Sequence, residues 1–141
     1  MKIYSYINNG VRGDAITIEC KITKGLPSIN IVGMANKAVE ESKERIRAAI
    51  VSSGYKFPAG RIVINLAPAD LPKDSSSLDL AIAIAILSAD KQIYNKNKIS
   101  TFIGELSLEG ELRAVSGIIG KLIAAKPSVN SRIIIPLGNQ A

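Results

Sequence analysis

The chain contains no histidine and no tryptophan, and it has a single cysteine, Cys20. Without histidine, neither a zinc site of the usual Cys and His ligands nor a Ser-His or Cys-His catalytic pair can be assembled. One cysteine cannot form a disulfide within the chain. Because four tyrosines and two phenylalanines are the only aromatic residues, a single-strand-binding platform built on base stacking is disfavoured.

The sequence also lacks a long apolar run. Its longest such stretch, Leu78 to Ala89, is too short for the roughly 20 residues that a membrane-spanning helix needs. The N-terminus, MKIYSYINNG, has Ser, Asn and Gly where a signal peptide needs a continuous apolar stretch. We therefore expect a cytoplasmic protein with no membrane partner.

What the chain does contain is enough apolar material for one core. It has 141 residues, of which 47% are hydrophobic and 21% charged, a composition that predicts a single folded domain over residues 1–141. Its net charge of +6 favours anionic partners such as DNA without identifying one. The chain ends four residues after Leu137 with no polar tail, which suggests an N-terminal domain taken from a longer protein.

The first third of the chain is typical of β-structure. Ala15 to Thr23 alternates isoleucine and cysteine with Thr, Glu and Lys, the pattern of a half-buried strand. Ser28 to Val32 follows Gly25 and Pro27 and predicts the next strand, and Lys2 to Ile7 could form an earlier one. We expect antiparallel pairing in this region.

The middle of the chain changes period. Apolar residues from Val39 to Ile50 recur at helical spacing, with Asn36 as a candidate N-cap and Gly54 as a terminator. The β-branched segment Arg61 to Ala67 predicts a strand that leads into a polar loop. Leu78 to Ala89 alternates Ala and Ile, but its length and alanines favour a helix buried on nearly all sides.

The last third predicts a hairpin, a helix and a strand. Thr101 to Val115 has two apolar segments around a turn at Glu109-Gly110. Gly117 to Lys126 is expected to be helical, and Arg132 to Leu137 a final strand. The resulting order predicts an α/β (α+β) fold, with a mixed sheet and helices mainly on one face.

No motif for nucleotide hydrolysis is present. A P-loop requires G-x-x-x-x-G-K-[ST], whereas the segment from Gly117 to Lys121 reads GIIGK, with the wrong spacing and no Ser or Thr after the lysine. These glycines more simply allow a hairpin strand to turn into a helix.

A basic stripe on the first predicted helix is the candidate DNA contact. It consists of Lys37, Lys43, Arg45 and Arg47. Three glutamates, Glu40, Glu41 and Glu44, are interleaved with it and partly cancel its field, so a solvated helix face is the better interpretation.

Three blocks of the chain resemble a known family. They are GLPSINIVGMANKAVEESKERIRAAI (25–50), INLAPADLPKDSSSLDL (64–80) and FIGELSLEGELRAVSGI (102–118). In this order they closely resemble the N-terminal domain of the ComM/YifB family of magnesium-chelatase-like AAA+ ATPases. The family label reflects AAA+ similarity, so chelation is not implied.

The resemblance implies a fold like the proteolytic domain of Lon and the C-terminal domain of RadA. It also implies a following AAA+ module that holds ATP and magnesium, a hexameric full-length protein, and a role in DNA processing during natural transformation. No cofactor or metal is expected in residues 1–141 themselves.

The chain departs from the family in one loop, where the usual K-E-G-S-G-F-D-L reads KDSSSLDL over residues 73–80. When the chain is laid on the two Lon motifs, Ser77 matches the nucleophile and Lys121 the base of the Ser-Lys dyad. Against activity, Leu78 and Asp79 replace the small residues that follow the Lon serine and would crowd an oxyanion site. The simpler interpretation is that Ser77 caps a helix, Lys121 is a surface lysine, and Asp79 lies near the positive end of the helix.

Three functions therefore stay open. The leading hypothesis is a non-catalytic accessory domain of a ComM-like AAA+ ATPase, which acts in oligomer assembly or in guiding DNA to the motor. The second is a Lon-like serine peptidase that uses Ser77 and Lys121. The third, a stand-alone nucleic-acid-binding domain, depends mainly on the positive charge.

Overall fold

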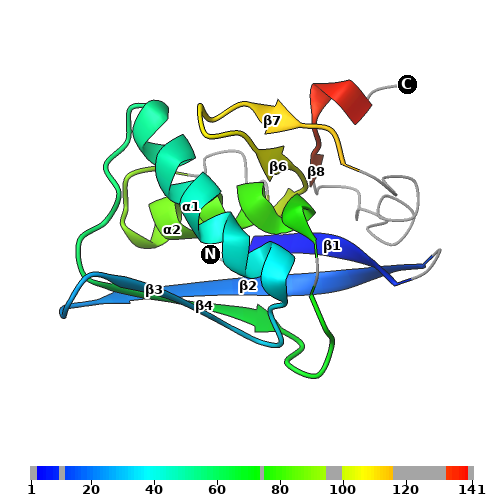
Figure 1. Ribbon diagram of the computed structural model, residues 1–141, viewed down its shortest axis with the longest axis horizontal. Coiled ribbons are helices and arrows are strands. Elements are labelled where there is room, and N and C mark those ends of the chain that lie inside the picture. Colours follow the sequence, from blue (N-terminus) through cyan, green and yellow to red (C-terminus); the bar gives the residue numbers. More distant parts are fainter. Residues whose placement is uncertain (1–2, 10–11, 74, 95–99, 116–132, 140–141) are drawn as a thin grey trace.

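The computed structural model describes residues 3–9, 12–73, 75–94, 100–115 and 133–139. In these residues a mixed sheet carries two helices on one of its faces, and a small hairpin lies beyond the helices (Figure 1). The strands are β1 (Ile3–Asn9), β2 (Arg12–Thr23), β3 (Ser28–Val32), β4 (Arg61–Ala67), β5 (Thr101–Phe102), β6 (Glu105–Leu106), β7 (Leu112–Arg113) and β8 (Ile133–Ile134). The helices are α1 (Lys37–Ser52) and α2 (Asp79–Ala89), with short 3-10 turns η1 (Ser76–Leu78) and η2 (Leu137–Asn139).

The main sheet has six strands in the order β3-β4-β2-β1-β5-β8. β2 runs antiparallel to its two neighbours, β1 and β4, whereas the pairs β3–β4, β1–β5 and β5–β8 are parallel. The expected antiparallel pairing of the first third is confirmed for β1 and β2. β3, however, does not pair with β2: it forms a parallel pair with β4, because α1 connects these two strands as a crossover.

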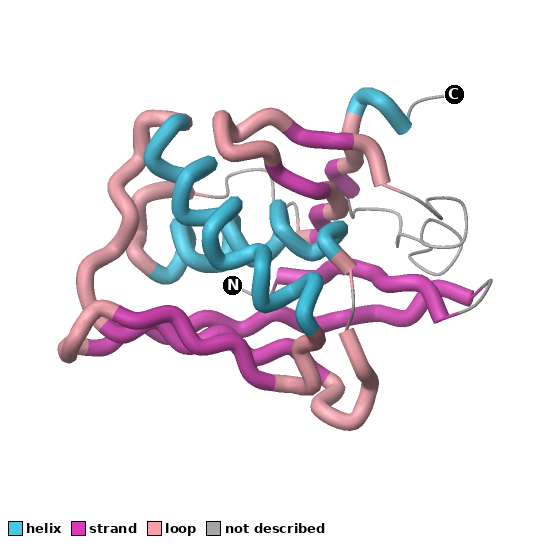
Figure 2. Tube along the Cα trace, viewed as in Figure 1, coloured by secondary structure: helices cyan, strands magenta, loops and turns pink. Residues whose placement is uncertain are grey.

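Both helices cover the same face of the sheet, as the sequence predicts (Figure 2). α2 packs on β1 and β2 on one side and on α1 on the other, so a helix that is apolar on nearly all sides is accommodated. Most of its alanines and isoleucines, including Ala81, Ile82 and Ile86, are buried in one cluster with the sheet residues Ile16 and Ile18. This layer is the core of the molecule.

The first predicted helix is confirmed in detail. α1 begins after Asn36, and its buried residues are those that recur at helical spacing: Val39, Ser42, Ile46, Ala49 and Ile50. Asn36 occupies the N-cap position without a side-chain hydrogen bond. Past the helix end, Gly54 adopts a φ of +91°, a conformation that glycine adopts without strain.

The hairpin predicted around Glu109-Gly110 is also present. β6 and β7 are antiparallel, with Leu106 opposite Leu112, and Gly110 takes a φ of +89° at the turn. The predicted strand from Arg132 to Leu137 is shorter in the structure, as β8 followed by η2. The predicted helix from Gly117 to Lys126 lies outside the described residues.

Candidate functional site

The serine turn, Ser75 to Ser77, connects the loop after β4 to α2. Ser75 is the N-cap of η1, and its Oγ accepts a hydrogen bond from the backbone N–H of Ser77 at 3.1 Å. The hydroxyl oxygens of Ser75 and Ser77 are 2.6 Å apart and share a second hydrogen bond. Ser77 is only 2% exposed. The prediction that Ser77 caps the helix is therefore wrong, because Ser75 supplies the cap and Ser77 is the residue that is capped.

Backbone hydrogen bonds fix this turn to the chain after β5. The N–H of Gly104 donates to the carbonyl oxygen of Ser77 at 2.9 Å, and the N–H of Leu80 donates to the carbonyl oxygen of Gly104 at 3.1 Å. Because the N–H of Ser77 is already bonded to Ser75, it is not free to stabilise an oxyanion. The turn is thus held in a conformation that engages both the hydroxyl and the N–H of Ser77.

Lys121, the second member of the candidate dyad, lies outside the described residues. The geometry of a Ser77–Lys121 pair is therefore not part of what the structure describes. Within the described residues, the Ser77 hydroxyl has Ser75 as its hydrogen-bond partner.

The carboxylate of Asp79 forms the centre of a buried ion pair. Asp79 is fully buried, and its two oxygens accept hydrogen bonds from Nε of Arg45 at 2.8 Å and from the terminal guanidinium nitrogen at 3.2 Å. The N–H of Leu106 donates to the same carboxylate at 3.1 Å. The pair therefore connects α1, α2 and β6.

Burial raises the pKa of Asp79, while the hydrogen bonds from Arg45, Ser42 and Leu106 oppose that rise. The same contact raises the pKa of Arg45, which stays cationic. The sequence correctly places Asp79 in the first turn of the helix, but the helix end is not its principal partner. The chain separation of 34 residues between Arg45 and Asp79 explains why no local pattern indicates the pair.

The basic stripe does not form one surface. Lys37 is 90% exposed, 3.9 Å from Glu41, and Lys43 pairs with Glu40 at 2.6 Å. Two members of the stripe therefore have carboxylate neighbours.

The two arginines of the stripe differ from each other. Arg47 is exposed, with its guanidinium 4.4 Å from the centre of the Phe57 ring. Arg45 points into the protein and binds Asp79, so its charge is neutralised by an internal partner. The stripe is thereby reduced to three exposed or half-exposed cations, two of them paired.

Lys73 is a residue whose position the sequence does not reveal. It lies in a polar loop after proline, where a lysine is ordinarily solvated, yet in the structure it is fully buried. Its ammonium donates hydrogen bonds to the carbonyl oxygens of Gly33 and Pro68. Both acceptors are backbone carbonyls, and among the described residues the Ser77 hydroxyl is bonded to Ser75 and not to Lys73.

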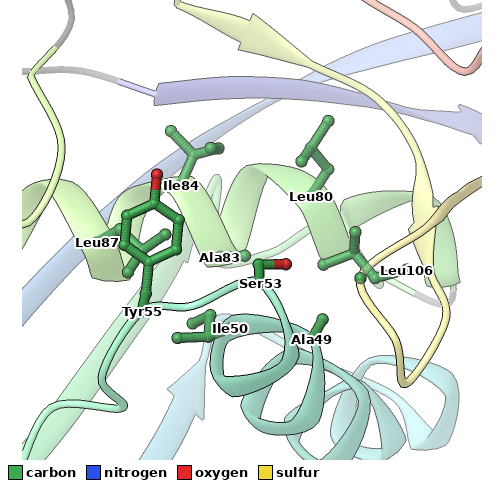
Figure 3. A pocket seen from close by; sticks show the side chains of 10 residues that line it. Ala49, Ile50, Ser53, Tyr55, Leu80, Ala83, Ile84, Leu87 and Leu106 are labelled. Atoms are coloured by element: carbon green, nitrogen blue, oxygen red, sulfur yellow. The ribbon is translucent and has the colours of Figure 1, made fainter.

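An apolar pocket of about 150 Å³ lies between α1, α2 and the β6–β7 hairpin (Figure 3). Ile50, Ala83, Ile84 and Leu87 line it, and the hydroxyl groups present are those of Ser53 and Tyr55. Since the lining has no carboxylate, lysine or cysteine, it offers no group for acid–base or covalent chemistry near neutral pH.

The single thiol is also unsuited to catalysis. Burial, with a smaller contribution from Asp90, raises the pKa of Cys20 to about 11, so the reactive thiolate is scarce near neutral pH. Among the described residues no three His, Cys, Asp or Glu side chains come together as a metal site. In the same part of the chain, no helix has the length and apolar character needed to cross a bilayer.

Comparison with known proteins identifies the relatives. The family model for subunit ChlI of magnesium chelatase matches residues 18–139. YifB of Escherichia coli K12 is 45% identical over 133 residues, which are 93% of this chain and 26% of YifB. The competence protein ComM of Haemophilus influenzae is 42% identical over 133 residues, 94% of this chain and 26% of ComM.

Lon proteases are more distant relatives. Lon protease 2 of Bacillus subtilis is 33% identical over 146 aligned residues, 91% of this chain and 26% of that protein. The chain spans about a quarter of the length of these curated relatives. The similarity to both groups is in line with the mixed α/β architecture expected from the sequence.

Proposed function

The chain belongs to the magnesium-chelatase ChlI family, as a ComM/YifB-like member, and we propose that it is a non-catalytic accessory domain of a ComM-like AAA+ ATPase. In this proposal ATP and magnesium bind to the AAA+ module of the longer protein. The domain itself contributes to assembly of a hexamer or to guiding DNA toward the motor. Its partners are then its own AAA+ module, further copies of the protein, and DNA.

The observation that supports a non-catalytic domain is the burial and hydrogen bonding of Ser77. Its hydroxyl is buried and hydrogen-bonded to Ser75, and its N–H is bonded to the same side chain. A serine nucleophile needs a base within hydrogen-bond reach that is neutral at working pH. Among the described residues the partner of this hydroxyl is a second serine, which cannot act as that base.

A fluorophosphonate probe tests this assignment. We expect no labelling of the chain under conditions in which an active serine peptidase, added to the same tube, is labelled completely. Ser77→Ala should leave the background unchanged. Labelling that disappears in both Ser77→Ala and Lys121→Ala would instead establish the peptidase.

The Lon-like peptidase is the second candidate because of one specific observation, the 33% identity with Lon protease 2. That similarity covers the loop in which Ser77 matches the Lon nucleophile. The matching position alone does not supply a reactive hydroxyl, which is why we rank it second.

An ATPase assay tests the proposal that ATP is hydrolysed by the AAA+ module and not by this domain. The chain has no P-loop, so we expect no magnesium-dependent ATP turnover from residues 1–141. Turnover that is abolished by a point substitution within these residues would contradict the proposal.

DNA binding by this domain, whether it guides DNA or acts as a stand-alone binder, should be weak. The net charge of +6 supports phosphate contacts, but the partly paired stripe on α1 gives no means of reading bases. We expect affinity that falls steeply with salt, that decreases in Arg47→Met, and that is unaffected by Arg45→Met as long as the variant is folded. Tight, sequence-specific binding at moderate salt would show that this interpretation of the surface is wrong.

A further inference from the structure

Lys73 occupies an unusual environment for a lysine. Its side chain is fully buried, and its ammonium donates to the carbonyl oxygens of Gly33 and Pro68. No carboxylate of a described residue lies within ion-pair distance of it. A buried ammonium is costly unless hydrogen bonds replace its water shell, so these two carbonyls are essential to the stability of the arrangement.

The two acceptors belong to different loops at the same end of the sheet. Gly33 begins the connection from β3 to α1, and Pro68 begins the connection from β4 to η1. Because β3 and β4 are parallel neighbours, both loops leave the sheet at the carboxyl ends of their strands. The side chain of Lys73 thus joins two segments that are about 35 residues apart along the chain.

The backbone around Lys73 reinforces this junction. The N–H of Lys73 donates to the carbonyl oxygen of Met34 at 2.9 Å, and the N–H of Asn36 donates to the carbonyl oxygen of Lys73 at 2.8 Å. Ala35 and Lys73 form a parallel bridge. The first loop therefore has both backbone and side-chain bonds to one residue of the second.

The first loop is also conformationally restrained. Met34 adopts a φ of +57°, which is unfavourable for a residue with a side chain. A strained backbone persists only where the surrounding contacts over-determine it.

Burial lowers the pKa of Lys73, with Asp70 opposing, so this residue too is held at a free-energy cost. A methionine would fill similar space without a charge, so Lys73→Met removes the two hydrogen bonds with little change in volume.

We propose that Lys73 is an ammonium latch, which locks the loop 33–36 to the loop 68–73 so that the two open together and not independently. The latch keeps the carboxyl ends of β3 and β4 in one arrangement. The loop after β4 is held in this way as far as Lys73, two positions before the serine turn. This inference does not depend on the proposed function, since it concerns only the coupling of two loops.

Hydrogen exchange in the Lys73→Met variant tests the latch. The amides of Asn36 and of position 73 report on the junction, and the amide of Ile64, in the middle of the sheet, reports on global unfolding. We expect exchange at the two junction amides to accelerate at least about tenfold more than exchange at Ile64. The matched control is Lys21→Met, which makes the same change at an exposed position of β2 and should leave all three amides alike.

Equal acceleration at all three amides, or none, would overturn the proposal, because Lys73 would then act only through overall stability or not at all. If Lys73→Met does not fold, the wild-type chain provides a second measurement. The ammonium protons of Lys73 should exchange with water at least about tenfold more slowly than those of Lys21 in a nitrogen-15 NMR experiment, since the latch must open first. Equally fast exchange at the two lysines would also refute the latch.

Discussion

Replacing Arg45 with methionine should destabilise the domain more than the same replacement of any other lysine or arginine of α1. The substitution keeps a long side chain but removes both hydrogen bonds that the guanidinium donates to the fully buried carboxylate of Asp79. Removal of one partner of a buried ion pair costs about 3–5 kcal/mol, because the other charge is left without compensation. The Arg45 side chain is 23% exposed, so water can reach part of the vacated space, and we expect about 3 kcal/mol.

The assay is urea denaturation followed by far-UV circular dichroism, since the chain has no tryptophan for fluorescence. Domains of this kind have a total stability of about 5–15 kcal/mol, so a loss of this size shifts the midpoint clearly, with an unchanged slope. The control is Arg47→Met, the same substitution two positions along the helix. It removes only an exposed contact with Phe57, worth about 0.5–1 kcal/mol.

A double variant separates the charge from its neighbours. Arg45→Met with Asp79→Leu removes both charges and leaves the N–H of Leu106 without its acceptor, which costs about 1–3 kcal/mol. The double variant should therefore be at least as stable as Arg45→Met alone. If Arg45→Met is no more damaging than Arg47→Met, the reasoning about the buried carboxylate is refuted.

The effect of Arg45→Met should also depend on pH. Burial raises the pKa of Asp79 and the Arg45 guanidinium opposes the rise, so in the variant this pKa is higher still. When the pKa of a carboxyl group is higher in the folded than in the unfolded state, the protein loses stability as the pH rises from the unfolded-state pKa to the folded-state pKa. The difference between wild type and variant should thus shrink as the pH is lowered through the folded-state pKa of Asp79, and a difference independent of pH would contradict this.

Three further substitutions follow from the same contacts. Gly33→Ala should lower the free energy of unfolding by more than the roughly 1–3 kcal/mol of backbone strain alone, because the added Cβ would lie 2.1 Å from the carbonyl oxygen of Leu66. The control is Gly54→Ala, which has a positive φ but open space around the added Cβ and therefore measures the strain by itself. Ser75→Ala should cost about 1–3 kcal/mol by leaving buried groups of Ser77 unpaired, and adding Ser77→Ala should recover part of that loss in the same urea titration. Burial lowers the pKa of Lys73 from 10.5. The stability of the wild type should therefore rise relative to that of Lys73→Met as the pH increases from that lowered value toward 10.5. A fall over this range would contradict the conclusion that the ammonium is buried.

The elements that the sequence predicts well are those whose pattern is local. β3 and β4 have the predicted bounds, and α1 differs from its predicted range only at the ends. In each case the periodicity of apolar residues is a direct consequence of which face the element buries, and that face can be read along the chain. The helical assignment of α2 is likewise confirmed, because its length and its alanines outweigh the alternation with isoleucine.

The strand order could not be obtained in the same way. β2 and β3 are separated by four residues, a connection short enough for a hairpin, yet β4 inserts between them. What decides this is the crossover through α1, a contact between segments that no local pattern describes. The bonds of Arg45 to Asp79 and of Lys73 to Gly33 escape sequence analysis for the same reason, since they join residues 34 and 40 positions apart.

The serine turn is where sequence comparison and structure together change the interpretation. The family pattern has glycine at the two positions that Ser75 and Ser77 occupy here, so both residues depart from it. The structure shows that these two side chains are bonded to each other, with Ser75 also accepting the N–H of Ser77. The hydroxyl of each serine therefore has the hydroxyl of the other serine as its hydrogen-bond partner. A serine introduced as a nucleophile would need its hydroxyl directed toward a substrate and a base, whereas a pair that satisfies itself in the interior needs neither. In the described residues the two serines thus exchange the flexibility of glycine for a hydrogen-bonded cap, and the match of Ser77 to the Lon nucleophile stays a prediction from the sequence.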